Sequence, residues 1–408
     1  MHASRRSLLS ALVAAAGAVT LIAPVLPVTA APIDKSENLT PIGQIQYTGG
    51  TELAARGKFL YAGELNGEDD RDQKPNKGGI HIYKLASSGK PREVGFLHCP
   101  GNDNDVEALT KWLIVVAYHN NRCGNPGDDG MLVVNIRNKR KPRVVGNVDM
   151  PAGGAGSAHT LTPYPGRRIV YINPGGLANG NSVEQIVRVG RRGKPKVPKI
   201  VASYGPADGG PASGCHDLSF HFNKERKLAF CAGKGHVTIW NVEDPFKPEF
   251  VSTIENPAIE FDHFAVASSD GKLLAIDDEA FAIHECRTGQ SGTGRVWIYD
   301  ISNPTVPVLQ SSFAPPRGGD ETGVGHYTGW IPSWCLSHGL SWKPGTHDLA
   351  VTWFTGGFSV LRLDNPTAPE EIAHYMAEDS ATYSALWHNG TLYTNDTYRG
   401  TEAFKISL

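Results

Sequence analysis

The sequence has almost no excess of charge of either sign, since 39 Lys and Arg stand against 41 Asp and Glu, for a formal charge of −2. This balance, together with 40% hydrophobic residues, excludes a disordered acidic chain and a globally basic nucleic-acid binder, so no nucleic-acid partner is expected. Familiar catalytic signatures are also missing, because no Gly-x-Ser-x-Gly, Walker, Gly-x-Gly-x-x-Gly or Cys-x-x-Cys pattern occurs. Whether the chain is an enzyme therefore stays open.

Long apolar runs are scarce, and the one that reaches membrane length lies at the N-terminus. Paired arginines at positions 5 and 6 precede an apolar run over residues 8–28, which ends in small residues typical of a cleavage site. We expect residues 1–30 to be a signal peptide cleaved near Ala30, followed by a short linker over 31–37. The protein is then secreted by bacterial export to an extracellular location, with no membrane span after cleavage. The arginines fit either a twin-arginine or an ordinary secretion signal, and an uncleaved anchor is a third alternative.

The main feature that the sequence does contain is a repeat. Seven Val/Ile-rich segments share one β-strand pattern, at 79–85, 130–136, 183–189, 236–242, 295–301, 357–363 and 400–406. The first six lead to turns that end in proline, at Pro91, Pro142, Pro195, Pro248, Pro307 and Pro369. Because proline fixes φ and a preceding Asn or Asp can bond the backbone two residues on, each strand should fold back as a hairpin. The repeat predicts an all-β, seven-bladed β-propeller of four-stranded blades over residues 38–408.

The repeat also predicts how the ring closes. The seventh copy ends the chain without its turn, while residues 42–47 look like a post-turn strand that lacks a partner. We expect residues 42–47 to pair with residues 401–406 and complete the last blade, which leaves no open edge. We expect the protein to be a monomer.

The clearest copy of the repeat runs from Trp297 through Asp300-Ile-Ser-Asn-Pro304 to Pro307. It resembles the LVIVD-repeat family of secreted β-propellers, in which a Val/Ile-rich strand leads into Asp-Ile-Ser-Asp/Asn-Pro-x-x-Pro. The first three copies depart from this pattern, with Gly-Lys-Pro or Arg-Lys-Pro in place of the Asp-Pro turn. The resemblance implies a seven-bladed propeller and an exported protein, and it implies no agreed activity.

Six cysteines allow fifteen pairings, and the blade model selects among them. In each blade the inner strand begins on the same face as the loop between the second and third strands. Sequential cysteines then meet on one face, which favours the pairs Cys99–Cys123, Cys215–Cys231 and Cys286–Cys335. Alternatively, Cys335 and His338 are a metal-binding pair.

The beginnings of the predicted inner strands carry polar residues that should point toward the central channel. Aligning these starts gives Glu52, Glu107, His159, His216, Asp262, His338 and Ser384, with Asp217 and His263 adjacent. Imidazoles and carboxylates around one axis suit Zn, Fe, Mn or Cu, so a divalent metal ion is a candidate cofactor. Its candidate ligands are Glu107, His159, His216, Asp262 and His338. The alternative is an ordinary polar, water-filled channel mouth, because no local His spacing defines a ligand set.

Other features should gather on the same face, which carries the long loops. Tyr327, Trp330 and Trp334 form either the wall of a ligand site or a small satellite core under the loops. The acidic stretch 277–279 is either a calcium site or a solvated loop. The candidate ligand site is therefore the channel mouth on this face, with His216, Asp262, His263 and His338 nearest its centre.

The opposite face should be basic. From Arg137 to Lys199, thirteen Lys or Arg stand against Asp149 and Glu184, a net charge of +11 over 63 residues. This stretch either docks a polyanion, such as an acidic cell-wall polymer, or consists of solvated turns.

Two functions compete at this stage. The first is an exported binding or scaffold protein whose partner is an unknown protein, a polysaccharide or a small-molecule ligand at the channel mouth. The second is a metal-dependent hydrolase or oxidoreductase with a His/carboxylate centre at the same mouth. Metal analysis of the exported protein separates the two.

Overall fold

The structure is a computed structural model, and its sheets belong to the compact unit Pro32–Leu408. The residues that it describes are 33–65, 78–100, 105–118, 121–123, 125–126, 130–149, 158–173, 184–190, 195–204, 214–233, 235–279, 294–316, 336–377 and 379–407. Regular structure in these ranges consists of β-strands. None of the described segments forms a helix that could cross a membrane.

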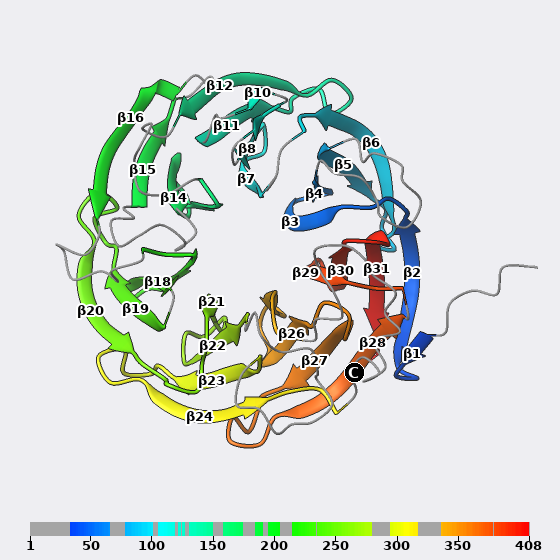
Figure 1. Cartoon of the computed structure of the whole chain (residues 1–408), viewed down its shortest axis with the longest axis vertical. Helices are drawn as coiled ribbons and strands as arrows, with labels where there is room; N and C mark the ends of the chain where they lie inside the picture. The colour runs from blue at the N-terminus through cyan, green and yellow to red at the C-terminus, as the bar shows by residue number, and fades with distance from the viewer. Residues whose placement is uncertain are drawn as a thin grey trace, which may run out of the picture. The chain divides into compact units, whose positions relative to one another are not determined.

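In the described part of the chain, seven sheets of four or five strands, here called blades, surround one axis (Figure 1). Blade 1 contains β3 (Gly50–Arg56), β4 (Phe59–Glu64), β5 (Gly79–Leu85) and β6 (Pro91–His98), and blade 2 contains β7 (Val106–Thr110), β8 (Leu113–Tyr118), β11 (Gly130–Asn135) and β12 (Arg143–Asp149). Blade 3 contains β13 (Thr160–Pro163), β14 (Ile169–Asn173), β15 (Glu184–Val189) and β16 (Pro195–Tyr204), and blade 4 contains β17 (Asp217–Phe222), β18 (Lys227–Gly233), β19 (His236–Asn241) and β20 (Glu249–Ile254).

The remaining blades follow the same order. Blade 5 contains β21 (Asp262–Ala267), β22 (Leu273–Asp278), β23 (Val296–Asp300) and β24 (Val308–Phe313), and blade 6 contains β25 (Leu340–Trp342), β26 (Asp348–Thr352), β27 (Phe358–Arg362) and β28 (Glu370–Ala377). Blade 7 contains β29 (Thr382–His388), β30 (Thr391–Asp396), β31 (Gly400–Ile406) and β2 (Leu39–Ile45), and a small hairpin of β9 (Asn121–Arg122) and β10 (Asn125–Pro126) accompanies blade 2. The predicted seven-bladed, all-β propeller is confirmed.

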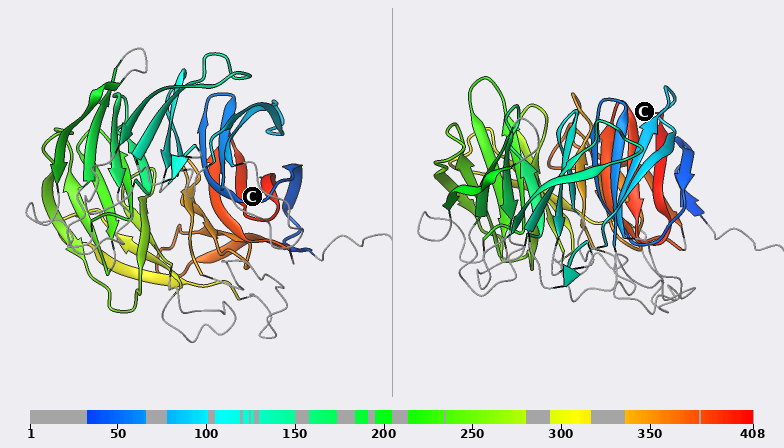
Figure 2. Two further views of the ribbon diagram at one scale, coloured as in Figure 1. Left: turned by 45° about the horizontal axis from the view of Figure 1, so that its top comes forward. Right: turned by 90° about the horizontal axis from the view of Figure 1, so that it is seen from above.

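The first strand of each blade lies nearest the axis. Each first strand contacts the first strands of the neighbouring blades, from β3 and β7 around to β29 and β3. Because the blades repeat one topology, all first strands begin at one face of the ring and end at the other, as the side views show (Figure 2). We call these the strand-start face and the strand-end face.

The second and third strands account for most of the core, because they are covered on both sides by neighbouring blades. Every residue of β8 and of β22 is buried. One cluster joins blade 1 to blade 2 through Ile80, Ile114 and Val134, and another joins blade 4 to blade 5. Continuous apolar runs are typical of strands buried on both faces, which explains the Val/Ile-rich repeat.

The seven copies of the repeat are the third strands of the seven blades, and the proline turns lead from the third to the fourth strand. In these turns the side chain of Asp244 accepts from the backbone N–H of Phe246 at 3.0 Å, and Asn303 accepts from Thr305 at 3.2 Å. The side-chain oxygen thus bonds the backbone two residues on, as the hairpin prediction requires.

The ring is closed by the N-terminal strand. β2 pairs antiparallel with β31, and the register joins Leu39 to Ile406 and Ile45 to Thr401. This confirms the predicted closure, in which a strand from one chain end completes a blade from the other. The pairing covers the edge of β31 with a fourth strand.

A second N-terminal strand was not predicted. β1 (Ile33–Lys35) lies within residues 31–37, for which we expected a linker, and it pairs antiparallel with β28 as a fifth strand of blade 6. The backbone N–H of Ser36 also donates to the carbonyl of His374 at 3.1 Å. The N-terminal segment therefore binds two successive blades, first blade 6 and then blade 7.

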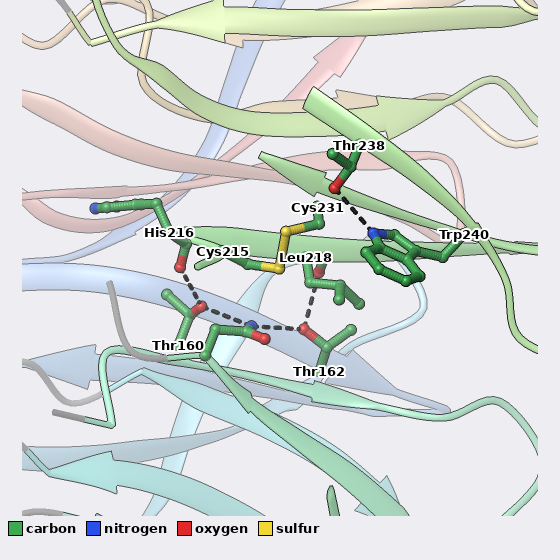
Figure 3. Close-up of a disulfide and its surroundings, with 9 residues drawn as sticks. Thr160, Thr162, Cys215, His216, Leu218, Cys231, Thr238 and Trp240 are labelled. Atoms are coloured by element: carbon green, nitrogen blue, oxygen red, sulfur yellow. Dashed lines mark hydrogen bonds between the residues drawn. A yellow bond between two sulfur atoms is a disulfide. The ribbon is translucent and has the colours of Figure 1, made fainter. Parts of the chain in front are cut away.

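Two of the three expected disulfides lie in the described residues, and both join the expected cysteines. Cys99 pairs with Cys123, and Cys215 pairs with Cys231. Figure 3 shows that the second bridge ties the residue before the inner strand β17 to the neighbouring strand β18. The third expected pair, Cys286–Cys335, lies outside the described residues.

Candidate functional site

Four imidazoles form a row on the wall of the channel at the strand-start face. They belong to His159, His216, His263 and His338, which come from blades 3, 4, 5 and 6 in order. Neighbouring ring centroids lie 4.2 Å apart for His159 and His216, 4.5 Å for His216 and His263, and 4.2 Å for His263 and His338. Residues that are up to 179 positions apart in the sequence are thus packed side by side.

The backbone explains how three of these residues reach the row. His159, His216 and His338 stand just before or at the start of an inner strand, and the backbone N–H of each donates to a carbonyl near the end of the second strand, at 2.9, 2.6 and 3.1 Å respectively. Each blade therefore presents its side chain at an equivalent position. The side chains at the starts of these inner strands therefore lie close together, as the sequence analysis expected.

Blade 5 reaches the row through a bulge. The pairing of β21 with β22 shifts register between Asp262 and Ala265, and within this bulge the backbone N–H of Phe264 donates to the carboxylate of Asp277 at 2.6 Å. As a result His263, and not Asp262, stands beside the imidazoles of the neighbouring blades. Asp262 is 1% exposed, and burial raises the pKa of its carboxyl to about 8.

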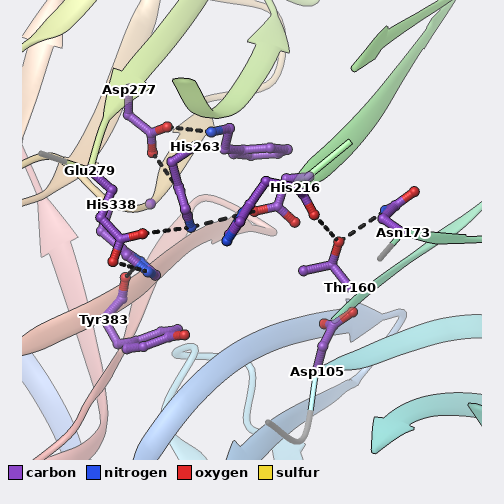
Figure 4. A network of polar contacts seen from close by, with 12 residues as sticks. Asp105, Thr160, Asn173, His216, His263, Asp277, Glu279, His338 and Tyr383 are labelled. Atoms are coloured by element: carbon purple, nitrogen blue, oxygen red, sulfur yellow. Dashed lines mark hydrogen bonds and ion pairs between the residues drawn. The ribbon is translucent and has the colours of Figure 1, made fainter. Parts of the chain in front are cut away.

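Two triads of possible ligands overlap at His263. One consists of His216, Asp217 and His263, the other of His263, Glu279 and His338, and within each triad one ligand atom per residue lies within 4.8 Å of the others. We call these five residues the His263 group; much of it is drawn in Figure 4. Their side chains are largely buried, and the most exposed, Asp217, is 16% accessible.

The His263 ring nitrogen Nε2 lies between carboxylates. It is 3.5 Å from Asp217 Oδ2 and 3.8 Å from Glu279 Oε2, and His338 Nε2 is 3.8 Å from the second Glu279 oxygen. His216 Nδ1 is 3.2 Å from Asp217 Oδ2. Two carboxylates therefore bridge three imidazoles, and ligand atoms bound to one metal ion commonly lie at such separations from each other.

The Nδ1 atoms of His338 and His263 face oxygen acceptors on the side away from Glu279. His338 Nδ1 lies 2.9 Å from the carbonyl oxygen of Tyr383, and because a carbonyl only accepts, Nδ1 carries the proton and Nε2 is left with its lone pair. His263 Nδ1 faces Asp277 Oδ2 at 3.5 Å. A histidine that ligates a metal commonly donates its other N–H to a carbonyl or carboxylate, and both rings have this arrangement.

The charges within the group are unequal. Burial alone would lower the pKa of His263, but the carboxylates of Asp277 and Glu279 raise it to about 10. Burial and the adjacent imidazoles lower the pKa of His216 to about 3 and that of His338 well below its ordinary value. At neutral pH one imidazolium therefore stands between two neutral imidazoles.

Asp217 completes this charge pattern. Although burial favours the protonated carboxyl, the hydrogen bond from His216 and the charge of His263 lower the pKa of Asp217 below its ordinary value. Asp277, deeper in the wall, has its pKa raised by burial to about 7, against the opposing effect of His263. The imidazolium of His263 thus carries the only positive charge among these described side chains, and a divalent cation could replace its Nε2 proton.

The donor set suits a transition metal. Imidazole nitrogens together with carboxylate oxygens are typical of Zn, Mn, Fe and Cu sites, and calcium prefers an all-oxygen shell. A neutral imidazole offers one nitrogen lone pair. Because the two triads share Nε2 of His263, this nitrogen can bind one ion, and the group is one site for a single ion. The five residues of the group could supply up to five ligands to it.

The predicted ligand residues are distributed as follows. His216 and His338 belong to the His263 group. His159 contacts the His216 ring without belonging to either triad, and Asp262 lies outside both. Glu107 lines a cavity of about 110 Å³ whose wall also includes Asp217, His263 and His338. Burial raises the pKa of Glu107 to about 8.

The rest of the channel wall is also polar. Glu52, Asp105, Thr160 and Ser384 line the same cavity. The side chain of Ser384 donates to the carbonyl of Thr51 at 2.6 Å, and Asp105 accepts from the backbone N–H of Leu161 at 2.6 Å. These groups are engaged in joining one blade to the next.

Glu279 is the one member of the His263 group that was not among the polar residues at the predicted strand starts, although it was expected on the same face. It belonged to the acidic stretch 277–279, for which we weighed calcium against a solvated loop. Its backbone N–H donates to Phe261 at 3.1 Å, which holds it just beyond the end of β22, beside the row of imidazoles. The signal available in the sequence was its position, because second strands end where inner strands begin.

The expected aromatic wall, Tyr327, Trp330 and Trp334, lies outside the described residues. Other aromatic rings pack against the imidazoles. His338 contacts Tyr383 and Phe354 at centroid distances of 4.1 and 4.6 Å, and His216 contacts Phe261 at 5.0 Å. These rings cover the imidazoles on their protein side, and electrostatic interactions are stronger in such buried surroundings.

Comparisons with known proteins establish the fold alone. No protein-family model matches the chain, and no curated protein matches it in sequence. Solved structures match in large number. The β-propeller domain of Cps50 (Swd1) from Myceliophteria thermophila has 9% identity and a TM-score of 0.58, over 90% of this chain and 100% of that domain.

Two further structures are similar. Sqt1 from Saccharomyces cerevisiae has 9% identity and a TM-score of 0.51, with 87% of this chain and 83% of that chain covered. The periplasmic gluconolactonase PpgL from Pseudomonas aeruginosa has 13% identity and a TM-score of 0.56, with 80% of this chain and 87% of that chain covered. A fold shared by proteins so differently named does not identify an activity.

Proposed function

We propose that this chain is an exported β-propeller that binds one divalent transition-metal ion in the channel at the strand-start face, through His216, Asp217, His263, Glu279 and His338. The observation that carries the proposal is the orientation of His263 and His338. Their Nδ1 atoms face Asp277 and the Tyr383 carbonyl, and their Nε2 atoms face the two oxygens of Glu279.

The export part of the proposal rests on different features. The apolar run over residues 8–28, with cleavage near Ala30, supports a signal peptide, and two disulfides are typical of exported proteins. The segment from Trp297 to Pro307 supports the proposal that the chain is a divergent member of the LVIVD-repeat family. N-terminal sequencing of the mature protein tests the cleavage site, and an uncleaved N-terminus contradicts it.

Metal content is the decisive measurement. Protein purified from its native export route should contain about one transition-metal ion per chain by elemental analysis. His263→Ala and Glu279→Gln should each lose the ion. His347→Ala is the matched control, because His347 is a partly exposed histidine paired with Asp270 far from the group. Metal-free protein that does not take up Zn²⁺, Mn²⁺, Fe²⁺ or Cu²⁺ would overturn the proposal.

A metal-dependent hydrolase is the second candidate function. It is favoured by Glu107, whose raised pKa makes it a neutral acid near pH 7, able to donate a proton across the cavity that it shares with His263. PpgL, a structural neighbour, is named a gluconolactonase. The test is hydrolysis of glucono-δ-lactone by metal-loaded protein, with Glu107→Gln as the variant. If the metal-loaded protein hydrolyses the lactone no faster than the metal-free protein, a binding or scaffold role is left for the bound ion.

A further inference from the structure

A second cavity opens at the strand-end face. Its volume is about 480 Å³, and its wall includes the last residues of three inner strands, Arg56, Thr110 and Pro163. The His263 group lies at the strand-start face, where the inner strands of blades 4 to 6 begin, so the two sites open on opposite faces of the ring. A volume of several hundred Å³ is typical of small-molecule sites.

One part of the cavity wall is apolar, although the lining as a whole is mixed. Leu109, Leu218, Phe220 and Phe264 line it. The hydroxyl of Thr162, which also lines it, is used within the fold, since it donates to the carbonyl of Leu218 at 2.8 Å. The wall therefore offers hydrophobic contact to the body of a ligand.

The rim of the cavity is cationic. Arg56, Arg167 and Arg168 line it, and within the described part of the chain none of them forms an ion pair with a carboxylate. Arg168 donates to the carbonyl of Gly190 at 3.1 Å, and Arg167 lies over the ring of Tyr164 at 5.6 Å. Arg56 and Arg167 are exposed, so their guanidinium donors are available to a ligand.

The single carboxyl group in the wall does not cancel this charge. It belongs to Glu107, which is buried with its pKa raised to about 8, so it is neutral at neutral pH. The surrounding face adds further positive charge. Lys111, Arg137 and Lys139 gather around the indole of Trp112, at 4.9, 5.5 and 6.0 Å. Such a surface raises the local concentration of anions.

We propose that the strand-end cavity binds a small organic acid, with the carboxylate at Arg56 and Arg167 and the apolar or ring-shaped body against Phe220 and Phe264. Arginine suits this role because its planar donors match a carboxylate in pairs. The two cavities adjoin inside the channel, since Glu107, Thr162, Leu218 and Phe264 line both. The inference itself does not depend on the metal.

Phenylacetate is a suitable probe, because it combines a carboxylate with an aromatic ring, and 2-phenylethanol is its neutral analogue. We expect phenylacetate to bind the purified exported protein at millimolar concentrations or below in calorimetry, and 2-phenylethanol to bind at least about tenfold more weakly. Arg56→Gln and Arg167→Gln should each weaken phenylacetate binding by about tenfold.

Arg140→Gln is the matched control, because it removes one charge from an exposed arginine near the same face but outside the cavity. It should change binding less than twofold. Equal binding of the acid and the alcohol, equal effects of all three arginine variants, or no binding of phenylacetate would each overturn the proposal. Metal content measured on the same variants should remain normal, so failure here is distinguishable from failure of the metal site.

Discussion

The imidazoles of His216 and His263 lie 4.5 Å apart between ring centroids, and yet their protonation differs completely. The pKa of His216 is lowered to about 3, by burial and by the imidazoles on either side, and that of His263 is raised to about 10. The difference arises from Asp277 and Glu279, which face His263 from blade 5. Two neighbouring imidazoles from adjacent blades thus differ in charge at neutral pH, one being neutral and the other positive.

The first prediction follows from this difference. A metal ion that binds His263 Nε2 must displace the proton held there, so Zn²⁺ binding at about pH 7.5 should release about one proton per ion. Calorimetry in buffers with different ionisation enthalpies measures this number. Asp277→Asn should lower the pKa of His263 and reduce the release at the same pH. Proton release near zero in the unmodified protein would show that His263 is already neutral.

The second prediction concerns His81 in blade 1, which lies 3.0 Å from Glu64 and 2.9 Å from Glu93. Burial opposes its charge, but these carboxylates raise its pKa above 6.5. Because the pKa of His81 is raised in the folded state, its protonation stabilises the protein, and this stabilisation is fully present below the unfolded-state pKa of 6.5. The stabilisation is lost as the pH rises through the folded-state pKa.

His81→Gln should therefore destabilise the protein more at about pH 5.5 than at about pH 9, by about 1.4 kcal/mol for each unit by which the pKa is raised. Denaturant unfolding at the two pH values measures the difference. His98→Gln is the control, because His98 is an exposed histidine at the end of β6 in the same blade. A loss that does not change with pH would mean that His81 is neutral in the folded protein.

The third prediction tests ring closure at Gly400. Its φ is +74°, and a Cβ there would collide with the backbone oxygen of Ile45 in β2. Gly390 has a similar φ of +70° but open space around it. Gly390→Ala should cost about 1 kcal/mol from backbone strain, and Gly400→Ala about 3 kcal/mol, because it also displaces the closing strand. Thermal unfolding compares them, and equal losses would contradict the closure's contribution to stability.

The fourth prediction concerns the bridge between Cys215 and Cys231, which closes a loop with a sequence separation of 16. Replacing both cysteines by alanine should lower the free energy of unfolding by about 3 kcal/mol, chiefly because the unfolded chain regains freedom. Both side chains are buried, so alanine avoids placing a new polar group in the core. Addition of reductant should lower the free energy of unfolding of the double variant less than that of the unmodified protein, because the variant no longer has this bridge to lose.

The fold could be predicted from the sequence because each repeat contains the same strand pattern followed by a turn. The Val/Ile-rich third strand and the Asn-Pro or Asp-Pro turn recur at similar intervals, and a blade that cannot bury both faces alone must stack on another. The strand pattern over residues 42–47 then predicted the pairing with residues 401–406 that β2 and β31 form. β1 was missed because three residues carry too little pattern to distinguish a strand from a linker.

The sequence by itself determined which end of each blade is polar, because side chains at repeated strand starts must meet around one axis. Only the tertiary structure decided which side chains join there. The bulge between Asp262 and Ala265 selects His263 in place of Asp262, and Phe261 holds Glu279 beside it. Bulges and charges summed across blades depend on residues of other strands and other blades, which a local pattern does not encode.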